Sequence, residues 1–197
     1  MRVVPKQSRS QAKIDLILST TAALLVEHGA DAITMSDIAA NCELPIGTLY
    51  HYFPNKNQVL KTLAEQSINA IDEELGQAIE QASRSNIDWM TLVDMVFDAY
   101  RQAPGLMPLF QAIKAIPELR DIVDNSNARV AEILANHVDP RRRLPPERRL
   151  LVCRLISELV QSCLEYALIQ CVDSVKVKEI SNELKVMLSA LQNHYFR

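Results

Sequence analysis

Apolar side chains recur at intervals of three and four residues through most of this chain, and this spacing is the strongest constraint on its fold. The first long stretch carries the pattern on Ile14, Ile17, Leu18, Thr21, Leu24, Leu25 and His28. Positions spaced in this way share one face of an α-helix. Only 4 of the 197 residues are Gly, 5% are aromatic, and helix-forming residues dominate. We therefore predict an all-α protein of about nine helices.

Capping residues place the boundaries of the first two helices. The first is predicted over 10–28 and ends at Gly29, because a residue with a left-handed conformation commonly terminates a helix. Thr34 can accept from the backbone of Asp37, whose carboxylate can reach back, so the pair forms a capping box. A short second helix should therefore run from Met35 to near residue 42.

The remaining helices follow from proline positions and from a second cap. Pro45 suits the first position of another short helix, which should end near Tyr52. Asn55 and Gln58 repeat the capping logic at the start of a long helix that continues to about Ala82. Further amphipathic helices are predicted over 87–103, 106–115, 118–137, 146–172 and 175–194.

Two short helices joined by a tight connection and braced by a longer one form a helix-turn-helix, in which the second short helix enters the major groove of DNA. The recognition helix would be 45–52. Its Thr48 and His51 can bond base edges or phosphates, and Ile46 can touch a thymine methyl. Gly47 permits close approach of the backbone to DNA.

Residues 33–39 (ITMSDIA), followed at a fixed interval by residues 47–56 (GTLYHYFPNK), resemble the DNA-binding domain of the TetR family of bacterial repressors. The resemblance covers roughly residues 10–60. It implies phosphate contacts from Thr34, Tyr52 and Lys56. It also implies groove contacts from Ile46, Thr48, Tyr50 and His51, with Leu49 and Phe53 as packing residues. Pro45 and Gly47 complete the predicted DNA-binding set.

The turn between the two short helices departs from the family pattern. Glu43, Leu44, Pro45 and Ile46 stand where the family usually has Gly, an aliphatic residue, Ser and often Lys. The missing Ser removes a cap and a phosphate donor, and Glu43 brings a negative charge close to DNA. Base specificity is therefore expected to depend on this turn.

Charge is distributed unevenly along the chain. The net charge is −3, but the first 13 residues carry four basic side chains and no acidic one. Phosphate attraction needs a local basic patch and not a basic whole, so the charge balance is compatible with DNA binding. A second basic run, Arg141 to Arg143 with Arg148 and Arg149, lies between prolines and beside acidic helices, and we interpret it as a solvated loop.

Other function classes find little support in the residues. No apolar stretch approaches the ~20 uncharged residues of a membrane span, and no secretory segment follows the basic start, so we expect a cytoplasmic protein without a membrane partner. Cys42, Cys153, Cys163 and Cys171 lie in apolar helical stretches without paired spacing and are predicted to be reduced thiols. We predict no metal site, no cofactor and no catalytic residues, since no nucleophile motif occurs.

The expected organisation is a DNA-binding domain over 1–54, a connecting helix over 55–82 and a ligand-binding and dimerisation domain over 83–197. Bulky side chains in the last part, together with two polar ones, are candidates for a pocket wall, although an ordinary core explains each of them singly. The candidate pocket residues are Trp89, Met90, Tyr100, Met107, Phe110, Glu158 and Gln161. Glu158 and Gln161 equally suit a solvated helix face. Candidates for a four-helix dimer interface are Leu155, Leu159, Tyr166, Leu184, Met187 and Leu191.

These features together favour a DNA-binding transcriptional regulator, and specifically a ligand-responsive repressor. Its partners would be a second copy of the chain, a palindromic double-stranded DNA operator and a small, apolar effector. Corepression by the effector stays open as the opposite sign of regulation. A helical interaction module that has lost DNA binding is the alternative, motivated by the unusual turn at residues 43–46.

Overall fold

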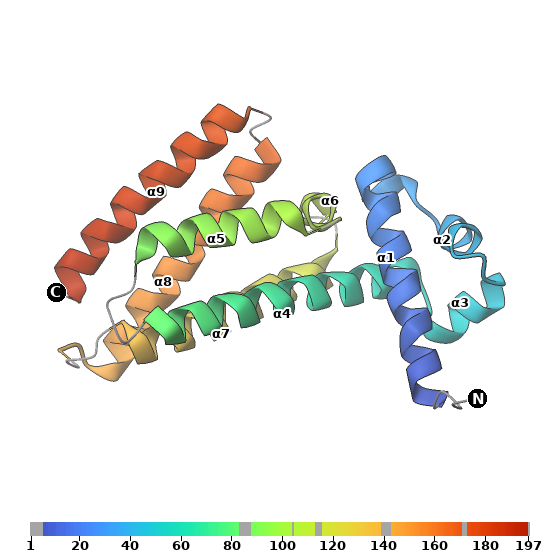
Figure 1. Ribbon diagram of the computed structural model, residues 1–197, viewed down its shortest axis with the longest axis horizontal. Helices are drawn as coiled ribbons and strands as arrows, with labels where there is room; N and C mark the ends of the chain where they lie inside the picture. The colour runs from blue at the N-terminus through green and yellow to red at the C-terminus, as the bar shows by residue number, and fades with distance from the viewer. Residues whose placement is uncertain are drawn as a thin grey trace. The chain divides into compact units, whose positions relative to one another are not determined.

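The computed structural model describes residues 6–82, 88–103, 105–112, 116–138, 143–170 and 173–196. All regular structure within these ranges is helical, which confirms the predicted all-α class (Figure 1). The first four helices are α1 (Lys6–Ala32), α2 (Met35–Asn41), α3 (Ile46–Tyr52) and α4 (Lys56–Ala82). They are followed by α5 (Trp89–Gln102), α6 (Leu106–Ala112), α7 (Pro117–His137), α8 (Pro146–Glu165), the π-helical turn η1 (Tyr166–Gln170) and α9 (Ser174–Tyr195).

Local capping explains why the predicted boundaries agree with the structure within a few residues. Gly29 has φ 76° and ψ 168°, so the regular part of α1 ends where the sequence predicted. Asn55 Oδ1 accepts a hydrogen bond from the Gln58 backbone at 2.9 Å at the start of α4. Pro45 differs slightly from expectation, because its ψ of 134° is extended and α3 begins one residue later, at Ile46.

The described residues form two compact units. The first comprises residues up to 67 together with 103–120, and the second comprises 68–102 together with residues from 121 onward. Helix α4 therefore contributes to both units, and α6 belongs with the three N-terminal helices. This division differs from the linear order of domains expected from the sequence, because the segment of α6 returns to pack on α1.

Helix α1 forms the base of the first unit, where it packs against α2 and α6, while α2 packs against α3. The core contains four fully buried side chains, each 0% exposed: Ile17, Leu25, Ile38 and Leu49. Complete burial of one such side chain contributes about 1.5–3 kcal/mol, so a few of them suffice to hold two short helices on α1.

Gly105 permits the close approach of α6 to α1. It has φ +74°, and a Cβ at this position would lie 2.9 Å from Ala22 Cα and 3.1 Å from the Ala22 carbonyl oxygen. Backbone atoms cannot move aside as a flexible side chain can. The turn into α6 therefore requires a residue without a side chain, both for its conformation and for space.

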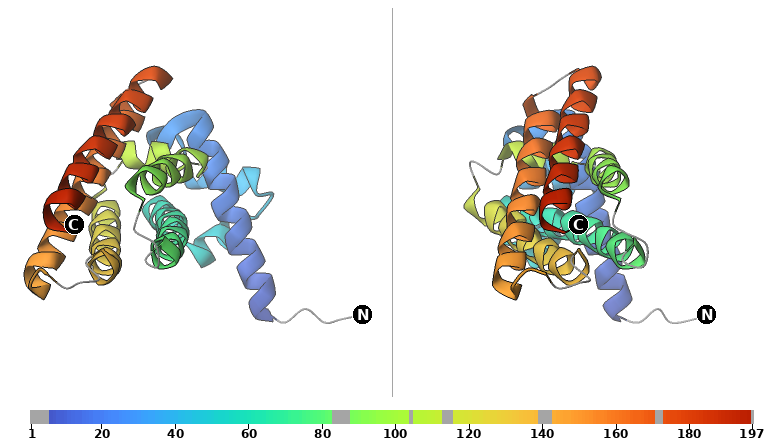
Figure 2. Two further views of the ribbon diagram at one scale, coloured as in Figure 1. Left: turned by 60° about the vertical axis from the view of Figure 1, so that its left-hand side comes forward. Right: turned by 90° about the vertical axis from the view of Figure 1, so that its left-hand side faces the viewer.

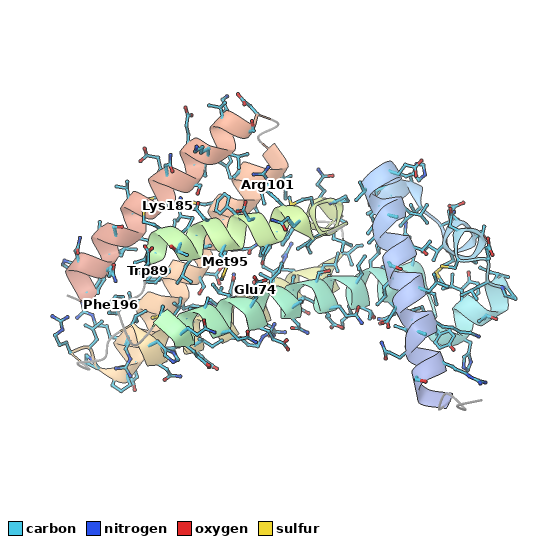
Figure 3. All side chains as sticks on the ribbon, in the orientation of Figure 1. Glu74, Trp89, Met95, Arg101, Lys185 and Phe196 are labelled. Atoms are coloured by element: carbon cyan, nitrogen blue, oxygen red, sulfur yellow. The ribbon has the colours of Figure 1, made fainter. Side chains whose placement is uncertain are left out.

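The second unit packs α9 against α5 and α8. Figures 1 and 2 both show α8 and α9 side by side and running in opposite directions. A salt bridge between Lys185 of α9 and Asp94 of α5 joins two of these helices, and Lys185 is only 7% exposed (Figure 3). The single long helix predicted over 146–172 is α8 followed by the π turn η1, and residues 171 and 172 lie outside the described ranges.

Candidate DNA-binding surface and effector cavity

A complete capping box holds the start of α2. Thr34 Oγ1 accepts from the Asp37 backbone at 3.2 Å, and the Asp37 carboxylate accepts from the Thr34 backbone at 2.8 Å and from its hydroxyl at 2.6 Å. The hydrogen bonds from the Thr34 hydroxyl and backbone lower the pKa of Asp37 below its ordinary value, with a smaller contribution from the charge of His28. The Thr34 hydroxyl is thus engaged within the protein, and a phosphate contact from it would replace or share these bonds.

Helix α3 presents one face to solvent and anchors the other. Leu49 is 0% exposed and Phe53, which follows the helix, is 6% exposed, so both have the packing role implied by the resemblance. Ile46 and Tyr50 are 42% and 51% exposed. Apolar side chains left in water on a short, well-anchored helix are unusual for a purely structural element and suit a surface that a partner covers.

The remaining predicted groove residues lie on the same short helix. Gly47 and His51 are exposed, Thr48 and Tyr52 are half-buried, and the His51 and Tyr52 rings meet edge to face with centroids 5.4 Å apart. Nothing lies within 4 Å of a Cβ built on Gly47, so this position is open to a partner. Six of the nine residues predicted to contact DNA therefore lie on α3, whereas Thr34, Pro45 and Lys56 lie outside it.

The turn before α3 contains a strained residue. Glu43 has φ 53°, and it is the one residue other than Gly with a positive φ among those that the structure describes. Left-handed backbone costs an L-residue roughly 1–2 kcal/mol. The family resemblance places Gly here, and this chain carries instead a residue whose side chain disfavours the observed φ.

Lys56 has a structural role that its sequence position did not reveal. Its ammonium donates to the carbonyl oxygens of Ala30 and Ile33, at 2.9 and 3.0 Å. These carbonyls lie at the end of α1 and just before α2, where helix ends leave acceptors unpaired. Lys56 thus ties the start of α4 to the connection between α1 and α2, in addition to the phosphate contact predicted for it.

A cavity of about 60 Å³ lies within the second unit, between α4, α5, α7, α8 and α9. Thirteen of its nineteen lining residues are apolar, among them Ile71, Leu75, Leu92 and Leu188, so the cavity suits an apolar ligand. A space of this size exceeds the roughly 10–15 Å³ that one water needs. It therefore has room for a small molecule.

The structure distributes the predicted pocket residues over several places. Trp89, Tyr100 and Gln161 line the cavity. Glu158 lies just behind the wall, where it binds Asn127. Met90 is 49% exposed, and Met107 and Phe110 belong to α6 in the first unit, so these three do not line the cavity. The α4 and α7 residues of the wall were missed because nothing in their local sequence distinguishes them from ordinary core positions.

Polar groups gather on one side of the cavity, around the buried carboxylate of Asp72. Ser126 Oγ donates to Asp72 Oδ1 at 2.7 Å, and the Arg129 guanidinium donates to Oδ2 at 2.6 Å. Arg129 also donates to Asn69 at 2.8 Å. Asp72 is 8% exposed, so its charge is balanced by a guanidinium and a hydroxyl, as a buried carboxylate requires. This network joins α4 to α7.

Two buried amides and one phenol complete this polar side. Asn127 Nδ2 donates to Glu158 at 3.2 Å, and Gln161 Nε2 donates to Glu165 at 3.1 Å. Burial, followed by the carboxylates of Asp72 and Glu165, raises the pKa of Tyr100 above its ordinary value. Tyr100 therefore stays protonated in the cavity wall.

Trp89 occupies the first turn of α5 in the cavity wall (Figure 3). Its side chain is 4% exposed, and its indole Nε1 is buried without a hydrogen-bond partner. An unpaired buried donor costs about 1–3 kcal/mol. The cap beside it is well formed, since Asp88 accepts from the Met90 backbone at 3.0 Å.

Apolar side chains exposed on α8 and α9 form a second candidate interface. Seven large ones lie on α8, α9 and the connection between them: Leu150, Leu151, Leu155, Tyr166, Val175, Val186 and Met187. Of the predicted dimer residues, Leu155, Tyr166 and Met187 are 60%, 53% and 41% exposed, and Leu159 and Leu191 are half-buried. Leu184 is 0% exposed, because it packs inside the protomer, and it is therefore not available to a partner.

The cysteines that the structure describes are buried or partly buried thiols. Cys42 and Cys153 are buried free thiols and Cys163 is partly buried, while Cys171, Arg141 and Arg142 lie outside the described residues. Burial raises the pKa of Cys153 to about 12, which keeps that thiol unreactive. The described part of the chain contains no cluster of His, Cys, Asp and Glu with the geometry of a metal site, and no helix in it is long and apolar enough to span a membrane.

Comparison with known proteins identifies two family models along the chain. A family model described as bacterial regulatory proteins of the tetR family matches residues 17–63, and a model described as a tetracyclin repressor-like C-terminal domain matches residues 89–191. The transcriptional regulator EthR of Mycobacterium tuberculosis is 29% identical over 102 residues, which are 50% of this chain and 47% of EthR. This chain thus spans about half the length of that curated relative.

Solved structures match almost the whole chain. A putative TetR-family regulator from Mesorhizobium loti has a TM-score of 0.73 at 16% identity, covering 96% of this chain and 99% of its own. A TetR-family regulator from Streptomyces coelicolor has a TM-score of 0.63 at 24% identity, covering 91% and 99%. The family models reach both the N-terminal helices and the helices that enclose the cavity, and the chain is a member of the TetR family of DNA-binding transcriptional regulators.

Proposed function

We propose that this protein is a ligand-responsive repressor that binds a palindromic operator as a homodimer. The observation that carries the proposal is the position of α4, which connects the recognition helix to the cavity wall. This helix begins four residues after the recognition helix ends, and its later residues Ile71, Asp72, Leu75 and Ile79 line the cavity. A ligand that changes the cavity wall therefore acts on a helix that is directly connected to the DNA-reading element.

The response requires two conformations with different affinities for the ligand. If the ligand bound both equally well, the population that binds the operator would not change. The unpaired indole N–H of Trp89 supports a second arrangement of the wall, since a shift of the ring can satisfy this donor. We propose that the arrangement without ligand binds the operator and that the small molecule releases it.

Homodimer formation is proposed through α8 and α9. Leu155 and Tyr166 are eleven residues apart, about three helical turns, and so lie on one face of α8 and η1. Val175 and Val186 have the same separation on α9. Two exposed apolar stripes on adjacent antiparallel helices suit a second copy of the same surface, which forms a four-helix bundle with two-fold symmetry. Two recognition helices then read two half-sites.

Operator binding tests the first part of the proposal. The full chain is titrated against fluorescent DNA from upstream of its own gene, at several salt concentrations and without added ligand. Tyr52→Phe removes one predicted phosphate donor, and we expect weaker binding with an unchanged salt dependence, because the phenol carries no charge. Lys61→Ala on α4 is the control, because its only described ion pair is with Glu65 at 3.9 Å.

The outcomes separate the proposal from its main alternative. A helical interaction module would show no salt-dependent, sequence-specific DNA binding, and both variants would then behave like the natural protein. Release of the operator by a cavity ligand supports induction, and tighter binding with the ligand establishes corepression instead. The proposal of a regulator fails if no upstream duplex binds in preference to an unrelated one.

The dimer is tested by Leu155→Ala. Leu155 is 60% exposed, so its burial in a symmetric interface contributes about 1–2 kcal/mol for each copy and about 2–4 kcal/mol for the dimer. We expect sedimentation equilibrium to show dissociation at roughly 30-fold or more higher protein concentration. Val26→Ala is the matched control, since Val26 is 66% exposed on α1. Equal dissociation constants for the two variants would rule out this interface.

A further inference from the structure

We propose, on the basis of the ligand-responsive function above, that the cavity ligand is an apolar amine, bound as an ammonium whose N–H groups donate to the polar side of the cavity. The inference comes from the hydrogen bonds that the polar lining residues form with neighbouring protein groups. We call Asp72, Ser126, Asn127 and Gln161 the acceptor wall, because they line the cavity and each carries a side-chain oxygen that can accept a hydrogen bond.

The orientation of two amides is set by carboxylates. Glu158 accepts from Asn127 Nδ2, and Glu165 accepts from Gln161 Nε2. An ionised carboxylate can only accept, so the NH₂ end of each amide must point to it. One N–H of each amide is used in this way, so the amide oxygen and the second N–H are left for a ligand. Asn127 and Gln161 are 6% and 7% exposed, so these oxygens cannot be supplied freely by bulk water.

The hydroxyl and carboxylate of the acceptor wall have the same character. Ser126 uses its single hydroxyl proton on Asp72, which leaves only lone pairs on its oxygen. Asp72 is itself an acceptor. A ligand that meets Ser126 and Asp72 therefore forms hydrogen bonds with them only if it brings the donors.

The charge balance behind the wall favours a positive ligand. Asp72 is paired with Arg129, and Glu158 is paired with Arg154 at 2.6 Å. Glu165 has no basic side chain within 4.0 Å among the residues that the structure describes. Its field reaches the cavity, because the charges of Asp72 and Glu165 both contribute to the raised pKa of Tyr100. The half-buried Glu165 thus adds a negative charge beside the wall without an ion pair in the described part of the chain.

Other ligand classes fit less well. No Lys or Arg lines the cavity, so a carboxylate ligand would be buried without a counter-charge and against the existing carboxylates. A hydrocarbon would leave the amide oxygens without donors, which costs free energy in a buried site. An ammonium satisfies the oxygens and balances Glu165, while its apolar body fills the space between Ile71, Leu92 and Leu188.

The protein contains its own reporter for a direct binding test. Trp89 is the only tryptophan of the chain and lines the cavity, so its fluorescence reports ligand binding there. The full-length protein is titrated with cyclohexylmethylamine, cyclohexylmethanol and cyclohexanecarboxylate, which share one ring and differ in the head group. We expect the amine to bind at least tenfold more tightly than the carboxylate, with the alcohol between them.

A charge-removing variant tests the cause. Glu165→Gln keeps the shape and an acceptor for Gln161, and we expect it to weaken amine binding about tenfold while alcohol binding stays within twofold. Glu183→Gln, an exposed carboxylate on α9, is the matched control and should leave both unchanged. Circular dichroism melts verify that both variants fold.

Every outcome of these titrations decides the inference. Equal or tighter binding of the carboxylate overturns it, as does an unchanged amine affinity in Glu165→Gln or a lack of binding by all three probes. Operator binding is measured separately and without probes. A protein that binds its operator but ranks the head groups differently is still a regulator with another ligand, whereas a protein that binds amines but no operator contradicts the proposed function.

Discussion

The strained residue Glu43 allows a quantitative test of the turn that precedes the recognition helix. With φ 53°, an L-residue costs roughly 1–2 kcal/mol relative to Gly. Glycine also gives the unfolded chain more freedom, which offsets about 0.4–1 kcal/mol. We therefore expect Glu43→Gly to raise the free energy of unfolding by about 0.5–1 kcal/mol. The side chain is exposed, so its removal leaves no cavity.

Glu43→Ala is the matched control for this substitution. Alanine also removes the carboxylate but keeps the Cβ that causes the strain, so its stability should stay within about 0.5 kcal/mol of the natural protein. Urea unfolding is followed by circular dichroism at one fixed protein concentration, and hydrogen exchange of the α2 and α3 amides locates the effect. If Gly is no more stable than Ala at this position, the assignment of strain to the turn is wrong.

The same pair of variants separates strain from charge in DNA binding. Both variants remove the negative charge of Glu43 from the turn near α3. If the repulsion between this charge and the DNA phosphates is about 0.3–1 kcal/mol, its loss corresponds to a two- to fivefold gain in operator affinity. The gain should be similar for Gly and Ala and should shrink at high salt, because exposed charges are screened. A gain confined to Glu43→Gly would indicate that the backbone of the turn, and not the charge, limits binding.

Two further substitutions test the packing and the cap of the first unit. Gly105→Ala should destabilise the protein by roughly 2–4 kcal/mol, since it combines strain at φ +74° with a clash against Ala22. Gly29 has a similar φ of 76° and open space, and its ψ of 168° lies where essentially only Gly is found, so Gly29→Ala should cost about 1–3 kcal/mol in thermal unfolding and less than Gly105→Ala. Equal losses would show that α1 and α6 can separate at no cost. The lowered pKa of Asp37 means that its contribution to stability is present above its ordinary pKa of 3.8 and is lost as pH falls through the folded-state value. The stability difference between the natural protein and Asp37→Asn should therefore be constant near neutral pH and disappear in strong acid, and a difference that persists at pH 2 would contradict this role for the cap with Thr34.

Much of the helical architecture could be predicted because its signals are local. The capping box placed the start of α2 at Met35, and the predicted helix over 175–194 is observed as Ser174–Tyr195. Asn55 marked the start of α4 for the same reason. A cap involves residues three positions apart, so the sequence alone contains both partners. The ordered motif around α3 was sufficient to identify the DNA-binding family.

The cavity could not be predicted in this way. Trp89 and Gln161 were among the candidates, but Asp72 and Ser126 were not, since each lies on a helix whose pattern indicates only a buried face. The two are 54 residues apart in the chain, and their contact exists only because α4 packs on α7. Gly76 marks this approach, as a Cβ there would lie 3.3 Å from Ile133 Cδ1.

Tertiary structure also decided which surfaces are free. Leu184 and Met187 have the same apolar character in the sequence, yet one is 0% exposed and the other 41% exposed. The sequence motif predicts a phosphate contact for Lys56, whereas in the structure its ammonium donates to the Ala30 and Ile33 carbonyls, which lie 26 and 23 residues away. Periodicity and capping determine helices because they depend on neighbours along the chain. The partners of a side chain depend on how those helices pack, and only the folded structure contains that information.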